Sequence, residues 1–326
     1  MESKQTSVVS APHSIREGLV VSLFLLLLCL CACHRDGVTI SPEEQARKDS
    51  LALHVAVMPV TDCLPLYYAE RMGVFEKEKL DVRLHEYLST ADCDTALTNK
   101  VCQVAYTDLF RLKMMNLCDT THVLATLDGK LYLISARGKR IRSTKHLKER
   151  MVTLNRHSTA DYWSDQILEE AGLEAMDIYR PQINDIRLRT TMLCDELVDA
   201  AILPEPYASW AELKGHRRIA QTGEFTLPTA CFAIDSEVSN DTHRKKQMAA
   251  LIRVFRAAEG AMKKELCTDS LRSILLNKFT LPNEVVDSLI QHQADSPTLV
   301  VPNIGTAKSQ DIEIVEKWWT KRHSYN

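Results

Sequence analysis

The sequence predicts an α/β protein with two lobes and a helical C-terminal tail. From residue 51 onward, short apolar or alternating segments typical of strands are followed by amphipathic segments typical of helices. This alternation runs through two cycles, of which the second begins near residue 143, and beyond residue 235 the periodicity is helical. Repeated strand–helix units are typical of mainly parallel sheets with crossover helices on both faces.

The first cycle contains five expected strands and three expected helices. The segment 51–60 is short and apolar, as a buried strand is, and 80–88 alternates apolar and polar residues with period two. Further strands are expected at 101–107, 121–127 and 130–136. Helices are expected at 64–73, where a glycine ends the pattern, at 91–99 and at 108–117.

The second cycle repeats the same kinds of segment, and the tail follows it. Expected helices are 143–150, 158–172, 188–197 and 205–213, and expected strands are 151–155, 198–203, 217–221 and 229–235. The tail opens with a long helix at 242–266, continues with shorter helices and closes with one at 309–322. One face of the long helix carries Met248, Leu251, Ile252, Phe255 and Met262 at helical spacing.

Length and composition favour a soluble protein of two domains. The chain has 326 residues, of which 45% are hydrophobic and 25% charged, so it has enough apolar material for two cores. The formal net charge is −3 and no block of lysine and arginine stands out. We therefore expect no nucleic-acid partner.

The N-terminus has the features of an export signal. Arg16 precedes an apolar run at 19–32, which is shorter than the roughly 20 residues of a membrane span and fits the core of a signal peptide. The sequence LCAC at 30–33 resembles a bacterial lipobox that would be cleaved before Cys33. Cys29 and Cys31 each follow leucine, a poor residue at that position.

We therefore expect lipidation at Cys33, loss of residues 1–32 and a polar tether at 33–50. A plain signal peptide or a buried apolar segment is the alternative.

The cysteines of the body give no metal pattern. Seven of the ten cysteines lie beyond residue 33, and an odd number leaves at least one free thiol unless chains pair. No CxxC and no zinc-like spacing occurs among them. We expect Cys102, Cys194 and Cys231 to be buried as small apolar residues.

Polar residues follow the expected strands, where open sheets bind ligands. In the first cycle these ends read TDC at 61–63, STADC at 89–93 and YTD at 106–108, and in the second NRHST at 155–159 and PEPY at 204–207. Taken singly, most are better explained as helix N-caps. Taken together, they converge on one edge of each sheet.

No catalytic or metal-binding motif competes with these strand ends. The body lacks GxSxG, P-loop, GxGxxG and HExxH sequences, and no two histidines have the spacing of a metal site. We expect a protein that is not an enzyme, with no catalytic residues, no metal and no cofactor. The pattern alone fits a solute receptor and equally an unrecognised enzyme.

Three segments resemble a known family. HVAVMPVTDCLPLYYAERMGVFEKEKLDVRLHEY at 54–87, VAYTDL at 104–109 and VDAAILPEPYAS at 198–209 occur in the order found in class II periplasmic solute-binding proteins of ABC importers. The branch they resemble binds aliphatic sulfonates, nitrate-type anions or thiamine-precursor pyrimidines. The resemblance covers residues 51 to about 235, and the lipobox agrees with it.

This resemblance implies the type II periplasmic-binding-protein fold. Two mixed, mainly parallel sheets would be joined by two crossover strands, near Ile134 to Ala136 and Leu227 to Cys231, with the helical tail on lobe one. Lobe one would comprise 51–135 and 229–326, and lobe two 136–228. The lobes would close on the solute by hinge motion and then dock on a permease.

The resemblance also implies a set of cleft residues. Asp128 lies at the turn just before the first crossing, and two prolines would hold Glu205 in a stiff loop aimed across the cleft. Cys63 and Cys93 follow neighbouring strands and would form a disulfide or line the pocket as thiols. The expected ligand-binding residues are Asp62, Cys63, Ser89, Thr90, Tyr106, Thr107, Asp108, Asp128, His157, Ser158 and Glu205.

The charges of these residues give a mixed prediction of the solute. Arg156 and a helix N-terminus suit an anion, whereas Asp62, Asp108 and Glu205 suit a cation or an N–H donor. A bare sulfonate would be unfavourable beside three carboxylates, so we expect a nitrogenous, pyrimidine-like solute.

The expected partners are that solute, the permease and ATPase of an importer, and the membrane through the lipid anchor. The protein would be a monomer in a bacterial cell envelope, facing the periplasm or the cell exterior. Two alternatives stay open. One is an enzyme like the fungal thiamine-pyrimidine synthases, although the body lacks their compact cysteine-rich motif. The other is a lipoprotein that captures haem or a metal.

Overall fold

The computed structural model describes residues 41–117, 123–223, 227–264, 266, 268–293, 299 and 302–323. The expected signal peptide and lipidated Cys33 lie outside these residues, as do Cys118 and Cys267. No helix in the described ranges has both the length and the apolar content needed to cross a bilayer.

The end of the expected tether is helical. Helix α2 spans Pro42–Leu51, with two glutamates in its first turn and Lys48 in its last. This charge order complements the helix dipole, and proline is favoured at the start of a helix. We describe α2 by itself, and the body of the chain from Leu51 onward separately.

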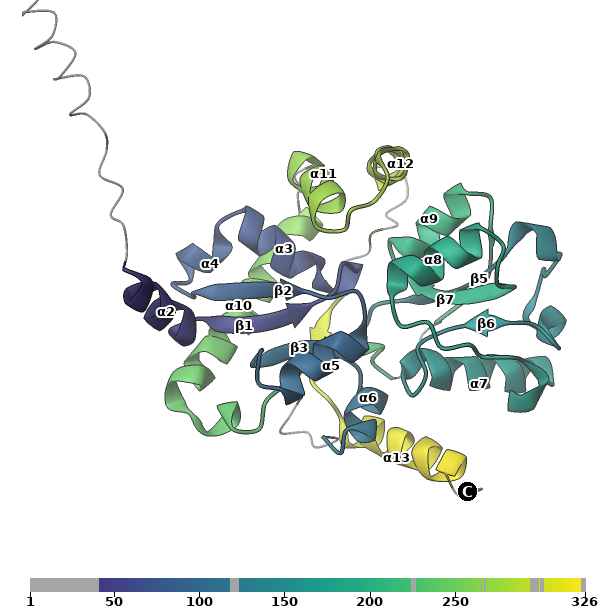
Figure 1. Cartoon of the computed structure of the whole chain (residues 1–326), viewed down its shortest axis with the longest axis horizontal. Helices are drawn as coiled ribbons and strands as arrows, with labels where there is room; N and C mark the ends of the chain where they lie inside the picture. Colours follow the sequence, from purple (N-terminus) through teal and green to yellow (C-terminus); the bar gives the residue numbers. More distant parts are fainter. Residues whose placement is uncertain are drawn as a thin grey trace, which may run out of the picture. The chain divides into compact units, whose positions relative to one another are not determined.

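The body contains two β-sheets with helices packed around them (Figure 1). The first sheet has the strand order β10-β4-β9-β3-β1-β2, and we call it, with its helices, lobe one. Its strands are β1 (Leu53–Val57), β2 (Val82–Glu86), β3 (Val104–Thr107), β4 (Val123–Leu127), β9 (Ala230–Ile234) and β10 (Ile304–Gly305). Its helices are α3 (Leu64–Arg71), α4 (Val74–Lys77), α5 (Thr90–Thr98), α6 (Leu109–Met114), α10 (Thr242–Lys264), α11 (Thr268–Asn277), α12 (Asn283–Gln293) and α13 (Ser309–His323).

The second sheet and its helices form what we call lobe two. Its strand order is β6-β7-β5-β8. The strands are β5 (Leu131–Ser135), β6 (Val152–Thr153), β7 (Ala200–Pro204) and β8 (Arg217–Gln221), and the helices are α7 (Thr159–Ala171), α8 (Ile186–Cys194) and α9 (Tyr207–Leu213). The two-lobed α/β architecture with mixed sheets is therefore confirmed.

Parallel pairing does not dominate, contrary to the prediction. Among the strand pairs of the described residues, β1–β2, β1–β3 and β6–β7 are parallel, whereas the other five are antiparallel. The reason is topological. Strand β9 enters the first sheet from lobe two and β5 enters the second sheet from lobe one, so each runs opposite to its neighbours.

The expected boundary after residue 135 is also wrong. Residues 131–135 form β5, which pairs with β7 and β8 in the second sheet rather than extending the first. The chain therefore crosses between Leu127 and Leu131. It returns between Gln221 and Ala230, where β9 rejoins the first sheet.

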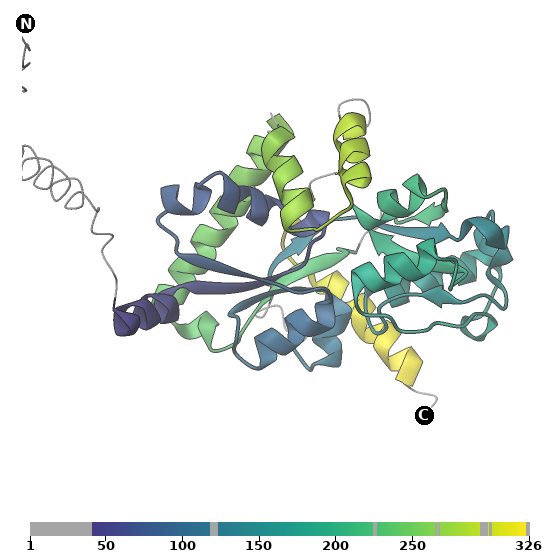
Figure 2. The same ribbon diagram turned by 45° about the horizontal axis from the view of Figure 1, so that its top comes forward.

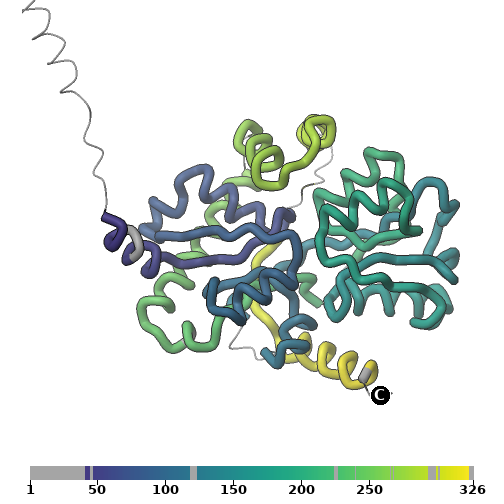
Figure 3. The backbone as a smooth tube through the Cα atoms, viewed as in Figure 1, coloured from purple at the N-terminus to yellow at the C-terminus, as the bar shows by residue number. Residues whose placement is uncertain are grey.

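The two crossing segments are hydrogen-bonded to each other. Thr229 Oγ1 donates to the carbonyl of Gly129 at 2.8 Å, and the Thr222 N–H donates to the carbonyl of Leu131 at 2.9 Å. Figure 3 shows the two lobes as separate folded regions of one continuous backbone. Motion of one lobe against the other would therefore bend a paired connection rather than two independent strands.

The C-terminal tail contacts both lobes, which extends the prediction that it lies on lobe one. Helix α10 packs on α3, and α13 packs on α6 of lobe one. From α13, the Trp318 indole N–H donates to Asp165 of α7 at 2.8 Å, and Arg322 pairs with the same carboxylate at 3.1 Å. Figures 1 and 2 show α13, in yellow, along the lower edge of the body, and in Figure 1 it lies below α6 of lobe one and α7 of lobe two.

Most segments lie where the periodicity places them. On the long helix, Met248, Leu251, Phe255 and Met262 are buried as expected, while Ile252 is half-buried. The helix expected at 143–150 is only a short 3₁₀ turn, Thr144–Leu147. Strand β10 and helix α4 were not expected, because two and four residues are too short to show a period.

Candidate functional site

A pocket lies between the two lobes at the ends of their central strands. Lobe one contributes Thr90, Tyr106, Thr107 and Asp108 from the start of α5 and the end of β3, together with apolar residues after β1. Lobe two contributes Asn155, Ser158, Thr159, Asn184 and Arg189 from the starts of α7 and α8. The cavity volume is about 70 Å³. An apolar cavity of about 150 Å³ holds benzene, so the space between the lobes in this arrangement has the size of a small solute.

Five of the eleven expected ligand-binding residues line this pocket. They are Thr90, Tyr106, Thr107, Asp108 and Ser158. Tyr106 and Thr107 are the last residues of β3, Asp108 and Ser158 are the N-caps of α6 and α7, and Thr90 begins α5, so all five lie at or just after strand ends, as the strand-end argument expects. The structure therefore brings together part of the predicted set, from both lobes.

Asp62 and Cys63 lie behind the pocket wall rather than on it. The Tyr106 hydroxyl, on a residue that lines the pocket, donates to Asp62 Oδ2 at 2.8 Å. Burial raises the pKa of Asp62 to about 6, despite this hydrogen bond. The carboxylate thus positions the tyrosine and does not itself line the pocket.

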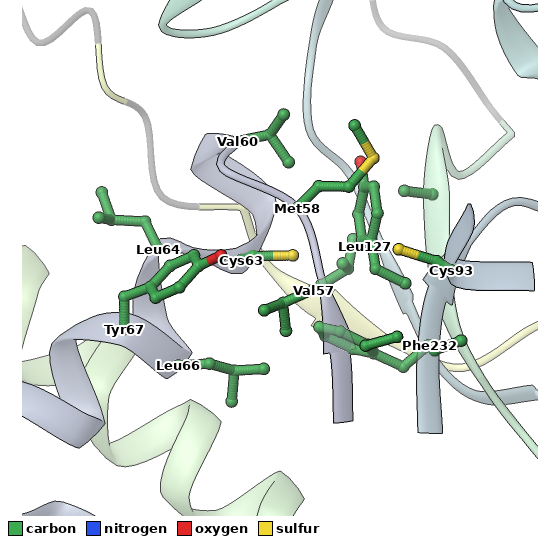
Figure 4. Close-up of a cluster of buried hydrophobic side chains, with 14 of the residues drawn as sticks. Val57, Met58, Val60, Cys63, Leu64, Leu66, Tyr67, Cys93, Leu127 and Phe232 are labelled. Atoms are coloured by element: carbon green, nitrogen blue, oxygen red, sulfur yellow. The ribbon is translucent and has the colours of Figure 1, made fainter. Parts of the chain in front are cut away.

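Neither alternative expected for Cys63 and Cys93, a disulfide or thiols lining the pocket, is found. Both thiols are free and fully buried, and burial raises the pKa of each. Figure 4 shows them among apolar side chains that include Val57 and Met58. Neither thiol lines the pocket, so both act here as small apolar residues of the core.

Ser89 is a helix cap, as the simpler interpretation of the strand ends held. Its hydroxyl accepts from the Asp92 N–H at 3.0 Å at the start of α5. Ser158 does the same for the Ala160 N–H at 3.2 Å on α7, but it also lines the pocket. Capping and pocket lining are therefore compatible at one residue.

Asp128 and His157 lie outside the pocket. Asp128 is exposed and accepts from the backbone N–H of Asn303 at 2.5 Å and from its side-chain amide at 2.6 Å. His157 has a left-handed backbone, with φ of 56°, and its ring centroid lies 5.7 Å from that of Trp319 on α13. Both residues therefore contact the C-terminal tail, Asp128 through Asn303 and His157 through Trp319.

Glu205 does not point across the cleft, and this expectation is wrong. Its carboxylate is buried inside lobe two, where it accepts from the Ser209 N–H at 3.0 Å and from Arg218 at 3.0 Å. Burial raises its pKa, while these donors oppose the shift. What meets lobe one is the carbonyl of Glu205, which accepts from the Thr61 N–H at 3.1 Å.

Asp108 is the carboxylate that the pocket does expose to a solute. Its Oδ1 accepts from the N–H groups of Phe110 and Arg111 and, across the cleft, from that of Thr159 at 3.2 Å. Its Oδ2 has no hydrogen bond within the described part of the chain. Burial raises the pKa of Asp108 to about 7, although Arg111 and the helix N–H groups lower it.

Arg189 was missed by the sequence analysis. It is 5% exposed and lines the pocket. Its guanidinium donates only to carbonyls, those of Ile183 at 3.0 Å, Ile202 at 2.9 Å and Asn184 at 3.4 Å. Among the described residues no carboxylate lies within 4.0 Å of it. Burial lowers its pKa to about 10, because nearby charge compensates only weakly.

Three helices begin at this pocket. The first residues of α5, α7 and α8 are Thr90, Thr159 and Ile186, and each lines it. Helix N-termini carry partial positive charge. Thr159 Oγ1 and Asn155 Oδ1 are buried there without a hydrogen-bond partner in the described ranges. Buried polar atoms are normally hydrogen-bonded, so these two atoms are acceptors that remain available near the pocket.

A larger groove lies elsewhere, between α7 and α13. Its volume is about 490 Å³, and its walls include Asp165, Trp318 and Arg322. These charges already pair with one another, Arg322 with Asp165 at 3.1 Å, and Arg180 binds the same carboxylate at 2.6 Å. The charges of this groove are thus paired with one another, whereas Arg189 in the pocket between the lobes has no carboxylate partner within 4.0 Å among the described residues. No cluster of three potential metal ligands occurs among the described residues.

Comparison with known proteins identifies relatives by family and by fold. A sequence model of the family described as "NMT1/THI5 like" matches residues 60–264. No curated protein matches the sequence.

Solved structures match the fold at low identity. The alkanesulfonate-binding protein SsuA of Xanthomonas axonopodis pv. citri, bound to MOPS, has 15% identity and a TM-score of 0.68, and the match covers 83% of this chain and 93% of that one. SsuA of Escherichia coli has 15% identity and a TM-score of 0.65 over 83% and 87%. The nitrate-binding protein NrtA of Synechocystis PCC 6803 has 15% identity and a TM-score of 0.63 over 74% and 70%. These matches establish the fold.

Proposed function

The chain belongs to the NMT1/THI5-like family, and from this premise we propose that it is a solute-binding receptor of an ABC importer. It holds a small molecule that carries an oxyanion in the pocket between its lobes and presents it to a permease–ATPase complex. Lipidated Cys33 anchors it as a monomer in a bacterial envelope, facing the periplasm or the exterior.

Arg189 is the observation that carries the ligand class. A buried charge without a partner costs several kcal/mol, and Arg189 has only carbonyl partners. An oxyanion from the solute would supply the missing charge, with the starts of α5, α7 and α8 adding partial positive charge. The names of the matched sulfonate- and nitrate-binding proteins agree with this chemistry.

The arrangement of the carboxylates gives less support to a pyrimidine-like solute than the sequence does. That prediction counted Asp62, Asp108 and Glu205 as pocket carboxylates, but only Asp108 lines the pocket. The pocket therefore contains one buried carboxylate and one buried guanidinium, and a solute with an oxyanion is no longer opposed by three acids.

Release of the bound solute tests this proposal. The full-length protein is purified in mild detergent, denatured, and the released small molecules are identified by mass spectrometry. We expect about one molecule per chain, bearing a sulfonate, carboxylate or similar oxyanion, which also raises the melting temperature when added back. At a free solute concentration of 100 times Kd, the free energy of unfolding should rise by about 2.7 kcal/mol.

The contrary outcomes are distinct. A released neutral or purely cationic molecule would overturn the ligand class. Turnover of the solute, bound pyridoxal phosphate or a haem absorbance band would instead favour the enzyme or the haem-capturing protein.

A further inference from the structure

The pocket has one buried acidic side chain and one buried basic side chain. Asp108 and Arg189 are each 5% exposed, and both line the same cavity of about 70 Å³. Across the described chain they form no ion pair with each other, so they lie more than 4.0 Å apart. A fold that needed only to neutralise them would place them in contact.

Neither charge is neutralised by another side chain at the pocket. The charge of Arg111 lowers the pKa of Asp108, but the Arg111 guanidinium is bound to Asp94 at 2.6 Å. Arg189 is bound to three carbonyls and no carboxylate. Each side chain therefore lacks a bound partner of opposite charge, and both side chains line the same cavity.

Acceptors gather near Asp108 in a way that suits a group with several N–H donors. The Thr159 N–H bridges to Asp108 Oδ1 at 3.2 Å, which brings these two residues together. Thr159 Oγ1 and Asn155 Oδ1 belong to two residues that line the pocket, and both atoms are buried without hydrogen-bond partners among the described residues. With Asp108 Oδ2 they make three acceptors near the pocket, and an ammonium has three donors.

We propose that the solute is a small zwitterion, whose ammonium binds Asp108 and whose oxyanion binds Arg189. This inference rests on the function proposed above and narrows its ligand class. A simple anion would leave Asp108 without a partner, and a simple amine would leave Arg189 without one. A zwitterion gives both side chains a partner of opposite charge and leaves the net charge of the pocket unchanged.

Matched pairs of small compounds test the inference by calorimetry. The zwitterions are glycine, 3-aminopropionate, 4-aminobutyrate and 2-aminoethanesulfonate, and their counterparts without the amine are acetate, propionate, butyrate and ethanesulfonate. We expect at least one zwitterion to bind tenfold or more tightly than its counterpart. The series also varies the distance between the charges and thereby measures the spacing of the two subsites.

An Asp108→Asn variant removes one charge while asparagine keeps the helix N-cap. In this variant we expect each zwitterion and its counterpart without the amine to bind with affinities within about threefold of each other. The change should come mainly from weaker binding of the zwitterion. Glu205→Gln is the matched control, because it neutralises a buried carboxylate outside the pocket, and it should leave the ratio unchanged. The melting temperature of each variant without ligand checks folding.

The outcomes separate this inference from the proposed function. Equal binding of a zwitterion and its counterpart by the native protein, or an unchanged ratio in Asp108→Asn, overturns the zwitterion. If no compound of the panel binds, the molecule released from the purified protein decides: one with both charges supports the inference, and one with only an oxyanion overturns it alone. A protein that releases no solute and binds none contradicts the proposed function itself.

Discussion

Two arginines of this protein are equally buried and differ in what surrounds them. Arg111 and Arg189 are each 5% exposed. Arg111 pairs with Asp94 at 2.6 Å, and Asp94 also accepts from the Thr107 hydroxyl at 2.6 Å. Arg189 has three carbonyls and a cavity. Arg111 has a carboxylate partner within the protein, and Arg189 has none among the described residues. Burial alone therefore does not identify a charged residue that binds a ligand.

The largest expected effect is the loss of stability on breaking the complete pair. Arg111→Met would leave Asp94 buried and uncompensated, which costs about 3–5 kcal/mol. We expect the melting temperature to fall by about 10 °C, at about 2–4 °C per kcal/mol for a chain of this size. Differential scanning calorimetry measures it. A variant as stable as the native protein would show that the ion pair of Arg111 does not stabilise the fold, and would contradict the contrast with Arg189.

The second prediction concerns the incomplete site. Arg189→Met should weaken binding of the released solute by about 100-fold, because removal of one partner of a buried charge pair typically costs 2–5 kcal/mol. The free energy of unfolding without ligand should change little or rise, since an unpaired buried charge is removed. Calorimetric titration and a melting curve measure the two quantities. Unchanged affinity with lost stability would make Arg189 another structural arginine.

The third prediction concerns Glu205, whose carboxylate is buried in lobe two and outside the pocket. Glu205→Gln weakens one charge-assisted bond to Arg218, which keeps Glu212 at 2.5 Å. We expect a loss of about 1–3 kcal/mol in stability and solute affinity within about twofold of the native value. A marked loss of affinity, measured under conditions where the variant is folded, would show that Glu205 takes part in binding the solute.

The smallest expected effect is a pH dependence of stability at Asp62. Its pKa is raised to about 6 by burial, against the Tyr106 hydrogen bond and with a contribution from Asp128. Between about pH 4 and 6 the folded state holds a proton that the unfolded state has released, so stability falls as pH rises through this window. Native protein should therefore lose about 1–3 kcal/mol relative to Asp62→Asn between pH 4 and pH 8.

Denaturant unfolding of both proteins across that range measures the difference. A gap that stays constant with pH would show that Asp62 is ionised in the folded state.

The fold was largely predictable because periodicity reports burial. Strands such as β1 and helices such as α7 have clear patterns, and N-cap residues such as Ser158 mark the helix starts. The membership of β5 was not predictable, because its pattern is the same whichever sheet it joins. Only the pairing of Leu131–Ser135 with β7 and β8 decides it.

The site was predictable only where chemistry and strand ends coincide. Asp108 follows β3 and caps α6, so its position was found. Arg189 lies in the first turn of α8, three residues after Ile186, and a helical arginine is normally exposed. Glu205 has the sequence context of a site residue, but Arg218, thirteen residues later, captures it. Long-range partners of this kind have no signature in the local sequence.

A crystal structure of the protein with its released solute tests the central claim most directly. The account predicts the solute in the pocket between the lobes, with its oxyanion within about 3 Å of the Arg189 guanidinium, the distance of a charge-assisted hydrogen bond. Solute bound instead in the larger groove beside Asp165, Trp318 and Arg322, with Arg189 still on its carbonyls alone, would contradict it.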